Sequence, residues 1–238
     1  MTLYDLLDVK MFADGADEAT MLEMANLPYI QGLTTNPTLM KKAGVSDYRQ
    51  FAKSILSVIR DKPVSFEVFS DTHSEMERQA TEIASWGDNV YVKIPITNTK
   101  AESSLSTVKR LVSKGVKVNV TAIMTVEQVA NVVGVLDSEV PSYVSVFAGR
   151  IADTGIDPVP IMSRCVGLLD SNKTAELIWA SPRELLNVFQ ANKVGCHVIT
   201  ATSDILRKLK LVGKDLDEFS IETVMMFHED AKEAGYTL

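Results

Sequence analysis

Lys93 is a lysine inside an otherwise apolar segment, VYVKIPI, in which it alternates with Val90, Val92 and Ile94. Successive side chains of a β-strand point to opposite faces, so we expect Lys93 to point away from these three residues. Burial disfavours the ammonium form and lowers the pKa of a lysine, which leaves more nucleophilic amine at neutral pH. The segment therefore predicts a lysine that forms a Schiff base with a carbonyl substrate.

Other apolar segments carry polar residues at the equivalent alternating positions. These residues are Glu67, Asn119, Thr121 and Ser145, and Asp14 ends the first such segment. If the apolar residues face a layer of helices, the polar ones converge with Lys93 inside a barrel. Asp14 and Glu67 could then supply the acid and base that imine formation and carbon–carbon cleavage need. Two alternatives stay open: Asp14 as the N-cap of a helix, and Lys93 with Glu67 as a structural ion pair.

A second set of polar residues follows the predicted strands. Residues 34–37 read TTNP after the second strand, whereas Arg150, Ser181 and Arg183 follow the sixth and seventh, where we expect helices to begin. Arginine forks, a hydroxyl and helix N-terminal N–H groups together suit a phosphate or a similar anion. For either arginine alone, a surface salt bridge is the alternative.

The elements that must position these residues are eight short β-rich runs that alternate with segments of helical period. The runs are 11–14, 29–34, 64–69, 90–94, 116–121, 143–147, 177–180 and 196–199, and the helical segments include 46–61, 72–86, 101–115 and 181–193. This alternation predicts an α/β fold, a (β/α)₈ barrel with its site at the carboxyl ends of the strands. An open doubly wound sheet is the alternative, but DGADEAT after the first run lacks a glycine-rich phosphate-binding pattern.

The composition is that of an ordinary globular protein, with 238 residues of which 46% are hydrophobic and 23% charged. We expect a single domain over residues 1–238. The net charge of −7 and the scattered lysines argue against nucleic acid or membranes as partners. Two cysteines without a CxxC pair and three histidines without ligand spacing predict neither a disulfide nor a metal site. An acidic start and the lack of a membrane-length apolar stretch predict a cytoplasmic location.

The C-terminal segment 216–235 is predicted to form an extra helix. One face carries Ile221, Val224, Met225 and His228, and the opposite side carries Phe219 and Met226. Such a helix could contact two surfaces, its own barrel and a neighbouring subunit. The alternative is that it packs only into its own domain.

Several of these segments together resemble a known family. They are FADGAD around Asp14, GLTTNPTL around Asn36, SFEVF around Glu67, VYVKIPIT around Lys93, VNVTAI around Thr121, VSVFAGRI around Arg150 and ASPRE around Ser181. Over nearly its whole length the chain is similar to the transaldolases, especially the short bacterial and archaeal type, and to their relative fructose 6-phosphate aldolase. The resemblance implies a (β/α)₈ barrel of class I aldolase type that needs no metal or organic cofactor and is a homo-oligomer.

The resemblance also implies roles for individual residues. Lys93 would be the Schiff-base lysine, Asp14 would abstract the hydroxyl proton that starts cleavage, and Glu67 with Thr121 would hold the water used in forming and hydrolysing the imine. The implied substrate-binding residues are Thr34, Asn36, Asn119, Ser145, Phe147, Arg150, Ser181 and Arg183. Among them, Asn36, Asn119 and Ser145 would hold a dihydroxyacetone unit, and the last three would clamp the phosphate.

Glu67 and Phe147 favour one relative over the other, because fructose 6-phosphate aldolases carry Gln and Tyr there and transaldolases carry Glu and Phe. The expected reaction transfers a three-carbon unit between sugar phosphates of the pentose phosphate pathway, for example from fructose 6-phosphate to erythrose 4-phosphate. Gly15, Pro182, Ala201 and Thr202 depart from the family pattern, so a related anion or a sugar of different length stays open. An aldolase-like activity or another donor sugar is the alternative within the family. A phosphate-binding barrel without turnover is the alternative from a different class.

Overall fold

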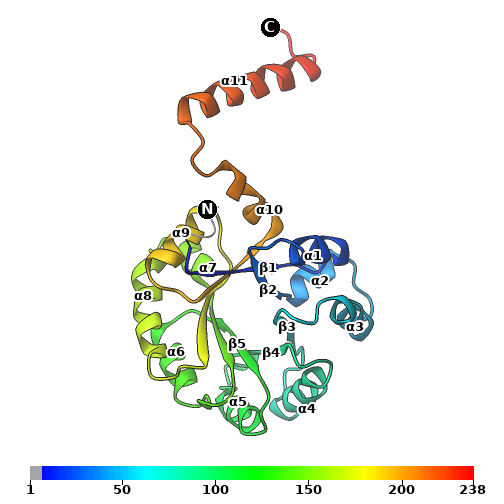
Figure 1. The fold of residues 1–238 in the computed structure, drawn as a ribbon, viewed down its shortest axis with the longest axis vertical. Helices are drawn as coiled ribbons and strands as arrows, with labels where there is room; N and C mark the ends of the chain where they lie inside the picture. Colours follow the sequence, from blue (N-terminus) through cyan, green and yellow to red (C-terminus); the bar gives the residue numbers. More distant parts are fainter. Residues whose placement is uncertain (1–6) are drawn as a thin grey trace. The chain divides into compact units, whose positions relative to one another are not determined.

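A closed barrel of eight parallel strands forms the centre of the protein in a computed structural model that describes residues 7–238 (Figure 1). The strands are β1 Lys10–Asp14, β2 Ile30–Thr34, β3 Val64–Glu67, β4 Val90–Pro95, β5 Val118–Ile123, β6 Ser142–Val146, β7 Ala175–Trp179 and β8 Val198–Thr202. Each strand pairs with its neighbours in sequence order, and β8 closes onto β1. The predicted (β/α)₈ barrel is therefore confirmed, and each predicted β-rich run overlaps a strand.

Helices surround the strands as an outer ring (Figure 1). They are α1 Glu18–Ala25, α2 Pro37–Lys42, α3 Tyr48–Val58, α4 His73–Ala84, α5 Leu105–Val112, α6 Val126–Val133, α7 Ala148–Asp153, α8 Pro158–Leu169, α9 Leu186–Lys193 and α10 Ser203–Leu206. Apolar residues on the outer faces of the strands, such as Val92 and Val118, are fully buried beneath this ring. Burial of these faces is the main source of the barrel's stability.

Several helices begin at a side chain that accepts a hydrogen bond from the first turn. Asp17 caps α1, Asn36 caps α2 and Asp47 caps α3, each accepting from a backbone N–H three residues later. These caps satisfy N–H groups that have no partner within the helix. Because Asp17 occupies the cap position of α1, the alternative that Asp14 serves as a helix N-cap is wrong.

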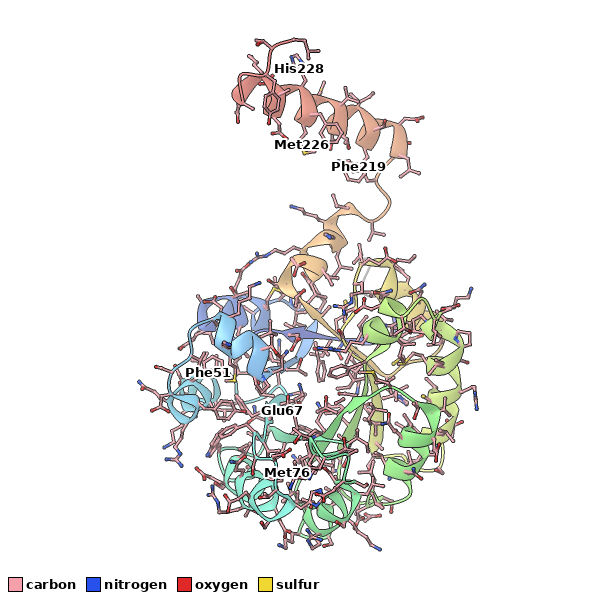
Figure 2. The ribbon with its side chains drawn as sticks, turned by 180° about the vertical axis from the view of Figure 1, so that it is seen from behind. Phe51, Glu67, Met76, Phe219, Met226 and His228 are labelled. Carbon is pink, nitrogen blue, oxygen red and sulfur yellow. The ribbon has the colours of Figure 1, made fainter. Side chains whose placement is uncertain are left out.

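The strand register places the predicted reactive residues in one layer of the barrel. Glu67 of β3 lies opposite Lys93 of β4, which lies opposite Asn119 of β5. Their chain neighbours Phe66 and Val92 are fully buried, as expected for residues that face the helices. In Figure 2 Glu67 lies inside the ring of helices. The period-two alternation thus turns these polar side chains towards the barrel interior.

The segment after β7 differs from the sequence-based expectation. The helix predicted from residue 181 begins at Leu186 instead, so Ser181 does not lie in the first turn of α9. Ser181 has φ +59°, a left-handed conformation that cannot start a right-handed helix. Pro182 contributes, because the residue before a proline is disfavoured in the right-handed helical region.

The residues divide into two compact units, one ending at Leu206 and one comprising Arg207–Leu238. The second unit contains a short 3₁₀ helix, η2 Arg207–Leu211, and the helix α11 Leu216–Glu233, so the predicted C-terminal helix is confirmed. Asp215 caps α11, and no residue of that helix is buried; Phe219, Met226 and His228 are labelled in Figure 2. The surfaces that α11 contacts, and the single-domain organisation, stay predictions.

Candidate active site

A cavity of about 430 Å³ opens at the carboxyl ends of the strands. It is lined by all but two of the predicted site residues, Asn119 and Arg183 being the exceptions. The remaining lining residues are Pro37, which belongs to the TTNP segment, and five residues that were not predicted as site residues: Thr38, Leu39, Ala122, Ala180 and Thr200. The cavity therefore lies on the face where barrels of this type carry their active sites.

Lys93 lies at the wall of this cavity and is only 6% exposed. Its Nζ donates a 2.7 Å hydrogen bond to the backbone carbonyl of Thr35 and lies 3.4 Å from Glu67 Oε2. The backbone carbonyl is thus the closer acceptor, and the carboxylate is the nearby counter-charge. A lysine held at this distance from a carboxyl group can pass protons to it during imine formation.

Two partly buried carboxyl groups interact with this one lysine. Burial raises the pKa of Asp14, against the opposing effects of the Lys93 charge and of a hydrogen bond from Thr34. Burial also raises the pKa of Glu67, and Lys93 acts in the opposite direction. Carboxyl groups with raised pKa values can accept and return protons closer to neutral pH than free Asp or Glu can.

Three successive residues of the TTNP segment contact Asp14 or Lys93. The hydroxyl of Thr34 donates to Asp14 Oδ1 at 2.7 Å, and the carbonyl of Thr35 accepts from Lys93. Asn36 Oδ1 accepts from Leu39 N as the N-cap of α2, while its Nδ2 lies 3.4 Å from Asp14 Oδ2. Pro37 begins α2 at the position where a helix needs no N–H donor. The end of β2 and the start of α2 therefore position Asp14 and Lys93 together.

Thr121 is buried, and its Oγ1 has no hydrogen-bond partner among residues 7–238. The next residue, Ala122, has φ +61°, and the pairing of β5 with β6 is irregular between Val120 and Ile123. Both Thr121 and Ala122 line the cavity. A buried hydroxyl without a partner is costly unless a ligand or water binds it, so this geometry makes Thr121 available to a bound molecule.

Asn119 does not line the cavity. It is fully buried, with Nδ2 donating to Ser65 Oγ at 3.0 Å and Oδ1 accepting from Ser145 Oγ at 2.7 Å. Ser145 does line the cavity. Asn119 therefore contacts two serines in this structure, and its hydrogen bond with Ser145 orients that residue.

Two of the three predicted anion-binding residues line the cavity. Arg150 and Ser181 line it, and the Arg150 guanidinium lies 5.8 Å from the centre of the Phe147 ring. Arg183 instead forms an ion pair with Asp153 and donates to that carboxylate through Nε at 3.0 Å. Of the two arginines, Arg150 is the one that the structure places at the cavity.

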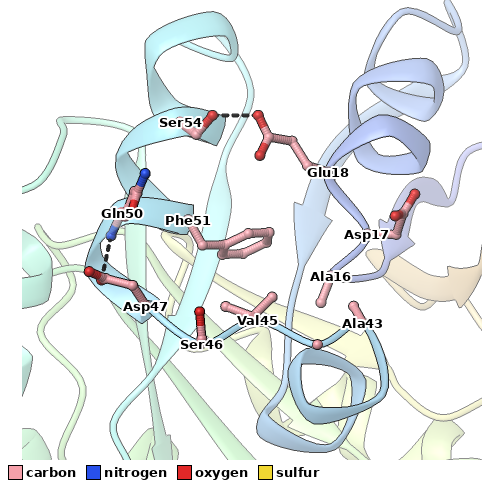
Figure 3. Close-up of a pocket in the computed structure, with 11 residues that line it drawn as sticks. Ala16, Asp17, Glu18, Ala43, Val45, Ser46, Asp47, Gln50, Phe51 and Ser54 are labelled. Atoms are coloured by element: carbon pink, nitrogen blue, oxygen red, sulfur yellow. Dashed lines mark hydrogen bonds between the residues drawn. The ribbon is translucent and has the colours of Figure 1, made fainter.

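Another cavity, of about 360 Å³, lies outside the barrel interior between α1 and α3 (Figure 3). Its acidic residues already have structural roles: Asp17 and Asp47 are helix caps, and Ser54 donates to Glu18. Across residues 7–238, no three His, Cys, Asp or Glu side chains group closely enough to hold a metal ion. In the same part of the chain, no helix is long and apolar enough to cross a membrane.

Comparison with known proteins places this chain among relatives of nearly equal length. The family described as transaldolase/fructose-6-phosphate aldolase matches residues 11–238. A probable transaldolase of Thermoanaerobacter sp. is 35% identical, with 95% of this chain and 99% of the relative covered. A probable transaldolase 2 of Listeria monocytogenes is 34% identical (89% and 94% covered), and a probable transaldolase of Streptococcus agalactiae is 35% identical (89% and 95% covered). A chain with this barrel, this cavity and these relatives belongs to the transaldolase/fructose-6-phosphate aldolase family.

Proposed function

We propose that the protein is a transaldolase that moves a three-carbon dihydroxyacetone unit from a ketose phosphate to an aldose phosphate through a Schiff base on Lys93. The observation that carries this proposal is the arrangement of Lys93, Asp14, Glu67 and Thr121 around one cavity. The donors we expect are fructose 6-phosphate and sedoheptulose 7-phosphate, which would place the reaction in the pentose phosphate pathway. We continue to expect a cytoplasmic homo-oligomer.

The first step is imine formation. The neutral amine of Lys93 attacks the ketose carbonyl, and the hydroxyl of the resulting carbinolamine, once protonated, leaves as water to give the iminium ion, the protonated imine. Glu67, 3.4 Å from Lys93 Nζ, is placed to take the amine proton and to protonate the departing hydroxyl. The unpartnered hydroxyl of Thr121 suits a hydrogen bond to that water.

The second step is carbon–carbon cleavage. Asp14 accepts the proton of the C4 hydroxyl, the C3–C4 bond breaks, and its electron pair moves to the iminium nitrogen as an enamine while the aldose phosphate leaves. The enamine then adds to the aldehyde of the acceptor, and Asp14 returns its proton to the new alkoxide. Hydrolysis of the imine regenerates Lys93 and releases the product ketose.

The residues at the cavity wall support binding of a phosphorylated sugar. Asn36 and Ser145 lie beside the reactive groups and suit the hydroxyls of the dihydroxyacetone unit. Arg150 and Ser181 also line the cavity and suit the terminal phosphate. Arg183 would join them if the phosphate displaced its bond to Asp153.

Trapping the Schiff base tests the proposal. We expect fructose 6-phosphate with borohydride to leave a reduced adduct on the peptide that contains Lys93, detected by mass spectrometry. The adduct should be absent in Lys93→Met and retained in Lys114→Met, in which a surface lysine paired with Glu77 is replaced. The lack of an adduct with any ketose would refute Schiff-base chemistry.

A second assay separates transaldolase from aldolase activity. We expect glyceraldehyde 3-phosphate to form from fructose 6-phosphate much faster when erythrose 4-phosphate is present, because the enamine needs an acceptor to turn over. Glu67 and Phe147, the residue types found in transaldolases at these positions, support this outcome. Equal rates with and without the acceptor would favour an aldolase.

A further inference from the structure

Thr200, in β8, belongs to a hydrogen-bond chain that ends at Asp14. Its side chain lines the cavity and is only 6% exposed. Thr200 Oγ1 lies 2.6 Å from Thr34 Oγ1, which in turn lies 2.7 Å from Asp14 Oδ1. The three residues come from β8, β2 and β1, and β1 lies between the other two strands in the barrel.

When Asp14 is ionised, the number of available protons determines which hydroxyl donates in each of these hydrogen bonds. A carboxylate can only accept, so the single proton of the Thr34 hydroxyl points to Asp14. The contact between the two threonine hydroxyls then needs the proton of Thr200. A hydroxyl that accepts a hydrogen bond becomes a better donor, so Thr200 strengthens the bond from Thr34 to Asp14.

The direction can reverse when Asp14 carries a proton. Protonated Asp14 can donate to Thr34, whose hydroxyl then rotates to donate to Thr200, and the Thr200 proton turns into the cavity. No proton passes between the residues in this change, since each hydroxyl keeps its own proton and only rotates. The chain can therefore satisfy Asp14 in both protonation states.

We propose that Thr200 is a positioning residue for the aldol step: through Thr34 it holds Asp14 in its reactive orientation and supports it both as the carboxylate base and as the protonated acid. This proposal rests on the function proposed above, because it needs Asp14 as the base of that step. Thr200 acts on Asp14 through Thr34, the residue that its hydroxyl contacts.

The charged groups that act on Asp14 set the expected pH dependence. Burial raises the pKa of Asp14, while Lys93 and the Thr34 hydrogen bond lower it, and Glu67 is the other carboxyl group close enough to interact with it. Loss of the Thr200 hydroxyl weakens the hydrogen bond from Thr34, which favours the carboxylate form of Asp14. We expect the pKa of Asp14 to rise by about half to one unit and kcat to fall about 3- to 10-fold, as for one lost hydrogen bond.

The test compares Thr200→Val with Thr200→Ser, which restores a hydroxyl, and with Thr107→Val, which replaces a fully buried threonine of α5. The readouts are the pH profile of kcat and the titration of the Asp14 carboxyl by ¹³C NMR. We expect the acid limb and the NMR pKa to move to higher pH in Thr200→Val, to return in Thr200→Ser and to stay unchanged in Thr107→Val.

An unchanged pH profile and an unchanged Asp14 titration in folded Thr200→Val would overturn the proposal, as would a Thr200→Ser variant that behaves like Thr200→Val. Thr200→Ala replaces Thr200→Val if the latter does not fold.

Borohydride trapping on Lys93 separates this proposal from the proposed function. Trapping that persists in Thr200→Val supports an effect confined to the aldol step. If trapping fails in the unmodified protein, the proposed function is wrong, and the NMR titration still decides whether Thr200 controls Asp14.

Discussion

The α-carbon of Gly149 lies against the backbone carbonyl of Ser181. A β-carbon built on Gly149 would lie 1.5 Å from that carbonyl oxygen, far inside van der Waals contact. Gly149 N also lies 3.4 Å from the carbonyl oxygen of Ala180, so the start of α7 and the end of β7 touch through their backbones. This contact fixes the position of Ser181, which has a left-handed backbone and lines the cavity.

Replacing Gly149 with alanine should therefore displace Ser181 and disturb the part of the cavity that we propose binds the phosphate. We expect Gly149→Ala to raise the KM for fructose 6-phosphate and to lower the free energy of unfolding, since backbone must move to admit the methyl group. Steady-state kinetics and urea unfolding measure both effects.

Gly167 provides the matched control, because it lies in α8 with no atom within 4 Å of an added β-carbon. Gly167→Ala should stabilise the protein by about 0.5–1 kcal/mol through helix propensity and leave the KM unchanged. Equal behaviour of the two variants would contradict the close approach of Gly149 to Ser181.

Thr121 offers a prediction in which activity and stability move in different directions. Its buried hydroxyl has no partner within residues 7–238, so Thr121→Val removes no hydrogen bond of the folded protein. We expect stability to stay the same or rise, because an unsatisfied buried hydroxyl is lost. If the hydroxyl holds the water of imine formation, kcat should fall about 10-fold or more, as for loss of a group that assists proton transfer. A large loss of stability would instead assign Thr121 a structural role.

Arg150 and Arg183 should contribute unequally to phosphate binding. Arg150 lines the cavity, whereas Arg183 is paired with Asp153. We expect Arg150→Ala to raise the KM for fructose 6-phosphate by about 10-fold or more, the range of a charge-assisted hydrogen bond, and Arg183→Ala to have a smaller effect. Unphosphorylated fructose as the donor is the control, since it carries no phosphate and neither variant should change its KM. A larger effect from Arg183 would mean that it leaves Asp153 when substrate binds.

Much of the site could be predicted because one rule, side-chain alternation along strands, determines it. Lys93 and Glu67 are polar residues in apolar runs, and the register of parallel neighbours brings them into one layer. The same rule applies to Thr200, which shares a face with Val198 and Thr202 in β8. It was missed because the predicted strand ended at Ile199, three residues before the observed end.

Other features of the site cannot be predicted from the types of the residues involved. The acceptor for Lys93 is the backbone carbonyl of Thr35, which any residue at that position would supply. The contact of Gly149 with Ser181 joins the start of α7 to the turn after β7, and a single glycine does not reveal which backbone approaches it. The pairing of Arg183 with Asp153 depends likewise on the turn that Ser181 makes with its left-handed conformation.

Glu67 should make the protein less stable as the pH rises. Burial raises its pKa above the ordinary value of 4.5, so the folded protein binds this proton more tightly than the unfolded chain does. The stabilisation is complete below the unfolded pKa and is lost as the pH rises through the folded pKa. The Glu67→Gln variant has no group that ionises at this position, so its stability does not fall with pH for this reason. Its stability relative to the unmodified protein should therefore increase with pH, by about 1.4 kcal/mol for each unit of raised pKa.

Glu77 gives the control of opposite sign. Hydrogen bonds from Lys114 and Arg110 lower its pKa, so its contribution is present above the unfolded pKa and is lost as the pH falls. Relative to the unmodified protein, Glu77→Gln should lose stability as the pH rises, whereas Glu67→Gln should gain it. Urea unfolding of the three proteins between pH 4 and pH 8 measures both slopes. If the stability of both variants changes with pH in the same direction, the folded protein does not favour the protonated form of Glu67. Burial then does not prepare Glu67 for proton transfer to and from Lys93.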